Sequence, residues 1–221
     1  MLEQVVVGSR RYGKSDMVLV SSVSIVHNDL WTKGNEGAAS ADIGVGASIG
    51  LSVEAPTGVQ LAQALGNLNM NSIVDTEDTG SFVLDVSFAR AAQDFFFWER
   101  GMNSRLTIQA LDAFGSVIAE FNANSHPDAR QFQNAGFSIL TGEIYDAGRG
   151  TPQVVGSLGL RLSQATNRLR LISNRNFAGP DFKVMAAVPE PMTMTGTALA
   201  AGAVLLARRK QRKQASDATQ G

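Results

Sequence analysis

The most unusual local feature of the sequence is a block of four aromatic residues, Phe95–Trp98, followed directly by Glu99 and Arg100. Successive side chains of a strand point to opposite faces, so the block would present two aromatic faces. If Trp98 points outward, it can stack on a sugar ring while Glu99 and Arg100 hydrogen-bond the hydroxyls. Trp31 is a second candidate for such a ligand face. The preferred interpretation is that all four aromatic side chains are buried and that Glu99 pairs with a nearby arginine.

Acidic side chains gather in segments that the sequence predicts to be loops. Calcium takes about six to eight oxygen ligands, and carboxylates with loop carbonyls supply them without cysteine or histidine. The alternative is turn chemistry, in which Asp and Asn side chains accept hydrogen bonds from nearby backbone amides. Both interpretations stay open, and beyond calcium we expect no cofactor. The candidate calcium ligands are Asp29, Asp42, Asp75, Glu77, Asp78 and Asp181.

Signals for catalysis are weak. The sequence has no cysteine, which excludes disulfides, thiolate metal sites and a cysteine nucleophile. Its two histidines lie far apart in the sequence, so it also lacks a paired-histidine metal motif. Two carboxylates such as Glu99 and Glu143 can in principle act on a glycoside, so a secreted hydrolase is the weakest alternative. We expect a protein that is not an enzyme.

The formal net charge of −1 hides an uneven distribution of charge. Residues 1–186 carry 14 basic and 18 acidic side chains, whereas five basic side chains lie together near the C-terminus. Binding of nucleic acid requires a basic face on the folded part of a protein. A mildly acidic body therefore argues against a nucleic-acid partner.

The C-terminal region has three parts in a fixed order. The first is Val188-Pro189-Glu190-Pro191, which two prolines hold extended and outside any helix. The second, residues 192–207, is uncharged and as a helix would span about 24 Å, against a hydrocarbon core of about 30 Å. The third is a basic cluster, which predicts that this end stays cytoplasmic and the body lies on the far side of the membrane. The cluster consists of Arg208, Arg209, Lys210, Arg212 and Lys213.

This order resembles the PEP-CTERM sorting signal of bacteria that possess an exosortase. The resemblance implies that the membrane-bound exosortase recognises the tail and cleaves near Pro189-Glu190-Pro191. It also implies localisation at the cell envelope or outer surface, with a single-pass C-terminal anchor before processing. An exopolysaccharide-associated or structural role follows as an expectation, with a carbohydrate-binding module as the alternative.

A second resemblance covers nearly all of the chain. The segments Asn28–Asp42, Asp75–Ser81, Phe96–Ser104 and Asn176–Val184 are similar to a cyanobacterial family of exosortase-dependent surface proteins. That family implies a signal peptide and one or two further strands before Val18. It implies no particular biochemical activity.

Hydrophobic alternation with a period of two predicts a mostly β fold, an antiparallel β-sandwich or jelly roll. The alternating side chains are the predicted core, namely Phe82, Leu84, Val86, Phe88, Leu106, Ile108, Leu160, Leu169 and Leu171. One short helix is predicted over Thr57–Leu65, with Thr57 as its N-cap and Gly66 as its stop. Residues 34–52 fit either a glycine-faced strand or a long loop.

These patterns divide the chain into four parts. Residues 1–17 are expected to be an irregular start, and the true N-terminus is expected upstream because no signal peptide is present. Residues 18–186 form the predicted β-sandwich ectodomain. Residues 187–213 are the sorting signal, with the motif at 188–191, a transmembrane helix at 192–207 and the basic stop at 208–213. Residues 214–221 are expected to be a disordered tail.

Overall fold

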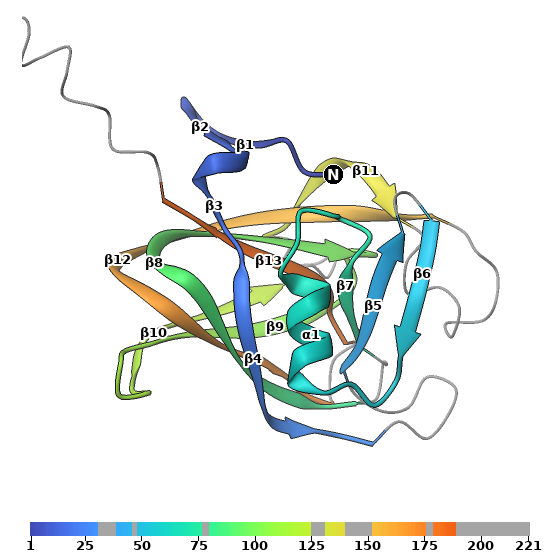
Figure 1. Ribbon diagram of the computed structural model, residues 1–221. Helices are drawn as coiled ribbons and strands as arrows, with labels where there is room; N and C mark the ends of the chain where they lie inside the picture. Colours follow the sequence, from blue (N-terminus) through green and yellow to red (C-terminus); the bar gives the residue numbers. More distant parts are fainter. Residues whose placement is uncertain are drawn as a thin grey trace, which may run out of the picture. The chain divides into compact units, whose positions relative to one another are not determined.

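The computed structural model describes residues 1–30, 39–45, 48–76, 80–124, 131–139, 152–175 and 179–188. The chain divides into two units, Met1–Val188 and Pro189–Gly221, and all described residues belong to the first. Most of these residues lie in antiparallel strands, with one short α-helix, which confirms the predicted mostly β fold (Figure 1). Within the described ranges, no helix has the length and apolar character needed to cross a membrane. The transmembrane helix predicted at 192–207 lies outside those ranges.

Within the described residues, eleven strands form one sheet and two further strands form a separate hairpin. The hairpin consists of β1 (Gln4–Val7) and β2 (Arg10–Gly13), and a 3₁₀ turn, η1 (Lys14–Asp16), follows it. The strands of the sheet are β3 (Met17–Val18), β4 (Val20–Asn28), β5 (Ala39–Val45), β6 (Ser48–Val53), β7 (Ile73–Thr76), β8 (Phe82–Arg100), β9 (Arg105–Leu111), β10 (Val117–Asn124), β11 (Gln133–Ile139), β12 (Gln153–Ser173) and β13 (Asp181–Ala187).

Two long strands, β8 and β12, organise the sheet. The first half of β8 pairs with β4 and with the end of β12, and its second half pairs with β13 and with the start of β12. The register between the two strands shifts around Arg161–Thr166, where both pass from one layer to the other. β9 and β10 extend the first layer, whereas β7, β5 and β6 extend the second. A sandwich has two sheets, but here one folded-over sheet supplies both layers.

The main core lies between the two layers. Across it, the rings of Phe82 and Phe182 stack with centroids 6.0 Å apart, and Phe88 meets Phe95 edge-on at 5.3 Å. The predicted core side chains all belong to it: Phe82, Leu84, Val86, Phe88, Leu106, Ile108, Leu169 and Leu171 are buried, and Leu160 is partly buried. The period-two prediction is confirmed for these residues.

A second, smaller core lies on the outer face of the second layer. Phe96, Trp98 and Met185 supply it from β8 and β13. Tyr12 and Met17 come from the N-terminal segment and pack against it. This face is therefore buried because the start of the chain covers it.

The prediction of an irregular start over residues 1–17 is wrong. Val7 pairs with Arg10, which leaves Gly8 and Ser9 as a two-residue hairpin turn. Gly8 has φ +59°, the left-handed conformation that such turns require and that glycine adopts without strain. The alternation in this segment is short, and the glycine turn is the signal that would have revealed it.

The short helix is confirmed where it was predicted. α1 (Gly58–Leu65) begins after Thr57, whose Oγ1 accepts a hydrogen bond from the amide of Gln60 at 3.4 Å. The Gln60 Oε1 accepts in turn from the Thr57 amide at 2.8 Å, which completes a capping box. Of the two readings of residues 34–52, the strand is right for the described part, since β5 and β6 pair with each other there.

Candidate functional site

The aromatic block lies in the second half of β8 and splits between the two cores. Phe95 and Phe97 belong to the main core, and Phe96 and Trp98 belong to the outer core. Only 5% of Phe96 and 6% of Trp98 is exposed. The preferred interpretation, burial of all four rings, is therefore right. The alternative of Trp98 as an open stacking platform is wrong, because the N-terminal segment and its neighbours cover the ring.

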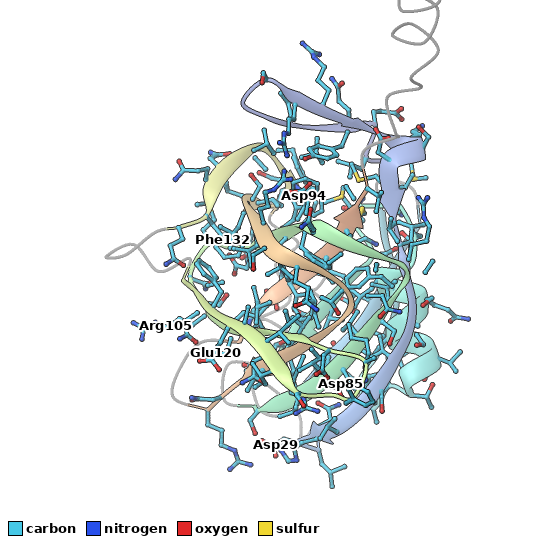
Figure 2. The ribbon with its side chains drawn as sticks, turned by 90° about the vertical axis from the view of Figure 1, so that its left-hand side faces the viewer. Asp29, Asp85, Asp94, Arg105, Glu120 and Phe132 are labelled. Carbon is cyan, nitrogen blue, oxygen red and sulfur yellow. The ribbon has the colours of Figure 1, made fainter. Side chains whose placement is uncertain are left out.

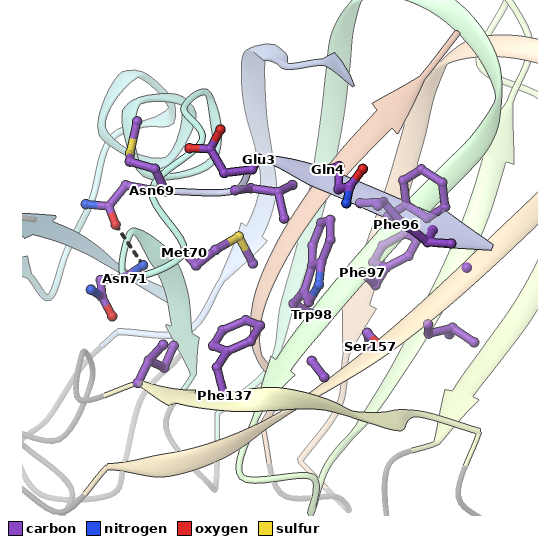
Figure 3. Close-up of a pocket in the computed structure, with 18 of the residues that line it drawn as sticks. Glu3, Gln4, Asn69, Met70, Asn71, Phe96, Phe97, Trp98, Phe137 and Ser157 are labelled. Carbon is purple, nitrogen blue, oxygen red and sulfur yellow. Dashed lines mark hydrogen bonds between the residues drawn. The ribbon is translucent and has the colours of Figure 1, made fainter. Parts of the chain in front are cut away.

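A pocket of about 630 Å³ nevertheless borders these two rings (Figure 3). Glu3 and the first residue of β1, Gln4, form one wall, and β11 contributes Phe137. Met70 and the asparagines on either side of it form another wall. The pocket thus combines an aromatic and aliphatic interior with amide and carboxylate groups at its rim.

A chain of side-chain-to-backbone hydrogen bonds shapes the asparagine wall. Asn67 Oδ1 accepts from the amide of Asn69 at 2.8 Å, and Asn69 Oδ1 accepts from the amide of Asn71 at 3.1 Å. These are the local bonds by which asparagine stabilises turns. The Asn67 amide group also donates to the carbonyl of Gln63 at 2.7 Å, at the end of α1. The helix end therefore holds the turn that presents Asn69, Met70 and Asn71 to the pocket.

The dimensions and lining of this pocket suit a small ligand with polar and apolar faces. Small-molecule sites have volumes of about 300–1,000 Å³ and a few polar groups among apolar walls. Since Trp98 is almost fully covered, a ligand would touch the edge of its ring rather than stack on it. A sugar would then depend on the amides of the rim for most of its hydrogen bonds.

Glu99 and Arg100, predicted to join Trp98 at a ligand face, point elsewhere. Glu99 is buried, and its Oε1 accepts a hydrogen bond from Ser104 Oγ at 2.7 Å. Neither residue lines the pocket. Trp31 lies outside the described residues, so the predicted group of Trp31, Trp98, Glu99 and Arg100 is not assembled among those that are described.

Arg100 lies instead at the centre of a buried charge cluster. Its Nη2 donates to Asp75 Oδ1 at 3.0 Å and to Asp181 Oδ2 at 2.7 Å, and its Nε donates to the same Asp181 oxygen at 3.1 Å. Asp181 Oδ1 accepts from the amide of Thr76 at 2.9 Å. Burial raises the pKa of Asp75 well above its usual value, and the neighbouring Asp181 raises it further, while Arg100 lowers it.

The structure brings together some of the candidate calcium ligands, but around an arginine. Asp75 and Asp181 lie side by side, and the Arg100 guanidinium occupies the position between them that a cation would need. Asp42 is buried and acts on the pKa of Asp75. The described residues contain no group of three metal-ligating side chains. Glu77 and Asp78 lie outside them.

Asp29 belongs to a different cluster at another end of the β body (Figure 2). Its Oδ2 accepts from Ser81 Oγ at 2.8 Å and from Arg175 Nε at 2.9 Å. Burial alone would raise the pKa of Asp29, but the hydrogen bonds from Ser81 and Arg175 outweigh it and the pKa falls below its usual value. Of the other predicted ligands, Asp75 and Asp181 lie at Arg100 instead.

His27 joins the same cluster and produces a Ser–His–Asp contact that the sequence did not suggest. Its Nε2 lies 3.0 Å from Asp29 Oδ1 and 3.3 Å from Ser81 Oγ. A serine nucleophile needs one ring nitrogen for the hydroxyl and the other for the orienting carboxylate. Here a single nitrogen faces both groups, and Ser81 donates to Asp29 itself. The arrangement is that of a hydrogen-bonded loop end and lacks the geometry of a proton relay.

Lys183 is a buried, charged residue that could not be singled out from the predicted motifs. It is fully buried on β13, and its Nζ donates to Ala64 O at 2.7 Å, Ser72 O at 2.9 Å and Asn67 Oδ1 at 3.1 Å. Burial lowers the pKa of Lys183 to about 7. The lysine ties β13 to the end of α1 and to the asparagine turn. A charged residue within the otherwise apolar run Phe182–Ala187 was the available signal.

Of the sorting motif, only Val188 lies within the described residues. Its amide donates to Asp16 O at 3.0 Å, next to the N-terminal 3₁₀ turn. Pro189, Glu190, Pro191 and the predicted membrane stop, Arg208–Lys213, lie outside. Comparisons of the chain with protein-family models, with curated proteins and with solved structures find no match.

Proposed function

We propose that the protein is a non-enzymatic cell-surface protein that an exosortase sorts and processes through its C-terminal tail. The observation that carries the proposal is the order of the tail: Pro189-Glu190-Pro191, sixteen uncharged residues, then a basic stop. Positive charge is retained on the cytoplasmic side, so the β body faces outward. The exosortase and the membrane are its partners, and the body serves as a sandwich-like ectodomain in the envelope or its exopolysaccharide.

The separation of the body from the tail supports this proposal. The body is one unit that ends at Val188, the first residue of the motif, and Pro189-Glu190-Pro191 follows directly. Cleavage near Pro189 would therefore leave every strand of the body intact. Among the buried carboxylates of the described residues, Asp75 and Asp181 are engaged by Arg100, and Glu99 is engaged by Ser104, an arrangement suited to a structural role.

The test is processing in a host that possesses an exosortase, with the full chain placed behind an export signal. The wild type should mature to a form shorter by about thirty residues, since cleavage near 189–191 removes the rest of the chain. Glu190→Ala should accumulate as a full-length membrane species. Replacing the five basic residues by glutamine should give mislocalised or released protein. Immunoblots of membrane, envelope and medium fractions that are identical with and without the exosortase gene would overturn the proposal.

The second candidate is a carbohydrate-binding module, and the pocket beside Phe96 and Trp98 favours it. The measurement is a glycan array probed with the full-length protein. Ser138→Trp should fill the pocket from its exposed wall and abolish a positive signal. Gln133→Trp, on the same strand but outside the pocket, should leave the signal unchanged. Binding that survives Ser138→Trp would move the ligand to another surface.

A further inference from the structure

Part of strand β12 has an edge that no strand of the described residues covers. Along one edge, Leu158–Arg161 pairs with β8. Along the other edge, β11 ends at the pair Gln133–Ser157, and β9 begins only at the pair Ala110–Leu169. Among the described residues, no strand therefore pairs with the outer edge of Leu158–Leu162. Open strand edges present unpaired backbone amides and carbonyls, which other chains can use for pairing.

An apolar slot of about 200 Å³ lies on the inner side of this edge. Its walls are Leu160 and Leu162 of β12, Phe121 of β10 and the core residue Ile108 of β9. Ala119 at the rim is exposed although it points inward with Phe121, so the space between the layers opens here. In another protein, a dry cavity of about 150 Å³ with similar apolar walls binds benzene. The slot is therefore large enough for an aliphatic or aromatic side chain.

A polar pocket of about 390 Å³ lies on the outer face of the same stretch of β12, between the β1–β2 hairpin and the β8–β12 pair. Arg10 and Arg161 line it together with Asp94. Tyr12 donates to Asp94 at 3.0 Å, and the half-exposed Arg161 lies 3.3 Å from the same carboxylate. Two arginines against one carboxylate leave a net positive charge. The outer pocket therefore favours an acidic side chain.

We propose that the Leu158–Leu162 edge of β12 binds an extended peptide segment whose residues alternate between apolar and acidic. A strand added to a sheet gains affinity from main-chain hydrogen bonds and specificity from pockets for alternate side chains. Here the two pockets lie on opposite faces of one strand, as that alternation requires. Apolar side chains enter the slot, and acidic side chains face Arg10 and Arg161. Figure 2 looks toward this part of the body, with Glu120 on β10 and Asp94 near the hairpin.

The charges at this edge favour a peptide segment from another protein over the same β12 edge of a second copy of this chain. Symmetric antiparallel pairing of two β12 edges would place the two Arg161 side chains at or near opposite positions. Like charges across a strand pair destabilise it. An acidic segment instead gains from both arginines. The proposal does not depend on the tail or on glycan binding.

The test uses the full-length protein and a fluorescein-labelled seven-residue peptide in which leucine alternates with aspartate, followed by fluorescence anisotropy. A peptide of the same composition with the leucines and aspartates in separate blocks is the control for alternation. A leucine–lysine peptide is the control for charge. The alternating acidic peptide should bind at least roughly tenfold more tightly than either control.

Two variants locate the site. Ala119→Trp fills the slot from an exposed position and should weaken peptide binding by about tenfold or more. Ile118→Trp, on the outer face of β10, should leave peptide binding unchanged. Arg161→Glu should reverse the preference toward the leucine–lysine peptide. Unchanged circular dichroism shows that each variant is folded. Equal binding of the block peptide, binding that survives Ala119→Trp, or self-association of the protein without peptide would overturn the proposal.

Discussion

The two carboxylates around Arg100 are expected to respond very differently to the same isosteric change. Asp181 accepts three hydrogen bonds, two of them from the Arg100 guanidinium. Asp75 accepts one hydrogen bond from the guanidinium. Two buried carboxylates against one arginine leave an excess negative charge. Burial and the neighbouring Asp181 raise the pKa of Asp75, so we expect Asp75 to be the carboxyl that binds a proton and donates a hydrogen bond to Asp181, which would remove the excess.

The magnitudes follow from this difference. Asp181→Asn removes the ionised partner of a buried arginine and should cost about 3–5 kcal/mol of unfolding free energy. Asp75→Asn replaces a protonated carboxyl by an amide of the same shape, which also donates to Asp181. It should cost less than about 1 kcal/mol, since the amide oxygen can still accept from Arg100 and an amide N–H can still donate to Asp181.

The pH dependence provides an independent check. A carboxyl whose folded pKa is raised binds more protons in the folded state, so its contribution to stability falls as pH rises. The decline begins near pH 4, where the unfolded aspartate titrates, and ends above the raised pKa of folded Asp75. The wild type should show this decline relative to Asp75→Asn. Urea denaturation of the full-length protein, followed by tryptophan fluorescence between pH 4 and 9, measures both effects. Equal costs for the two substitutions, or no difference in pH dependence, would refute the assignment of the proton to Asp75.

Three further predictions concern other parts of the body. The pKa of folded Lys183 lies below that of an unfolded lysine, so the wild type should gain stability relative to Lys183→Met as pH rises from about 7 toward about 10.4. Urea midpoints of the two proteins that change in parallel with pH would contradict this prediction. Thr57→Ala removes the N-cap of α1 and should cost about 1 kcal/mol in urea denaturation, whereas Thr57→Ser should cost little. Since Arg100 fills the space between Asp75 and Asp181, saturating calcium should leave the melting temperature unchanged; a rise that chelator reverses would show a calcium site elsewhere in the acidic loops.

The strands and the helix were predictable because their signals are local. The alternation from Phe82 to Phe88 and the Thr57–Gln60 capping box each lie within a few residues. The split of Phe95–Trp98 between two faces also follows from the period of a strand. What the period does not show is which face stays open. Trp98 is covered by the N-terminal segment, which follows no long periodic pattern.

The charge cluster could not be predicted, because its members come from distant parts of the chain. Arg100 meets Asp181 across 81 positions and Asp75 across 25. The sequence grouped acidic residues by loop, whereas the sheet groups them by register, with Asp181 opposite Arg100. Asp29 follows β4, whose last residue pairs with Phe82 at the start of β8, whereas Arg100 is the last residue of β8. Predicting the cluster would have required knowing that β8 pairs with β13.

The position of β13 within the sheet has a mechanical consequence. β13 is the last strand of the body, and it pairs with β8 along one edge and with β3 and β7 along the other. If the tail anchors the chain as we propose, tension from the anchor enters at Val188, whose amide is itself bonded to Asp16. The pull is then shared by hydrogen-bond ladders on both edges of an interior strand, whereas a terminal strand at a sheet edge would peel away one bond at a time. A body attached in this way resists being torn open by drag on the cell surface.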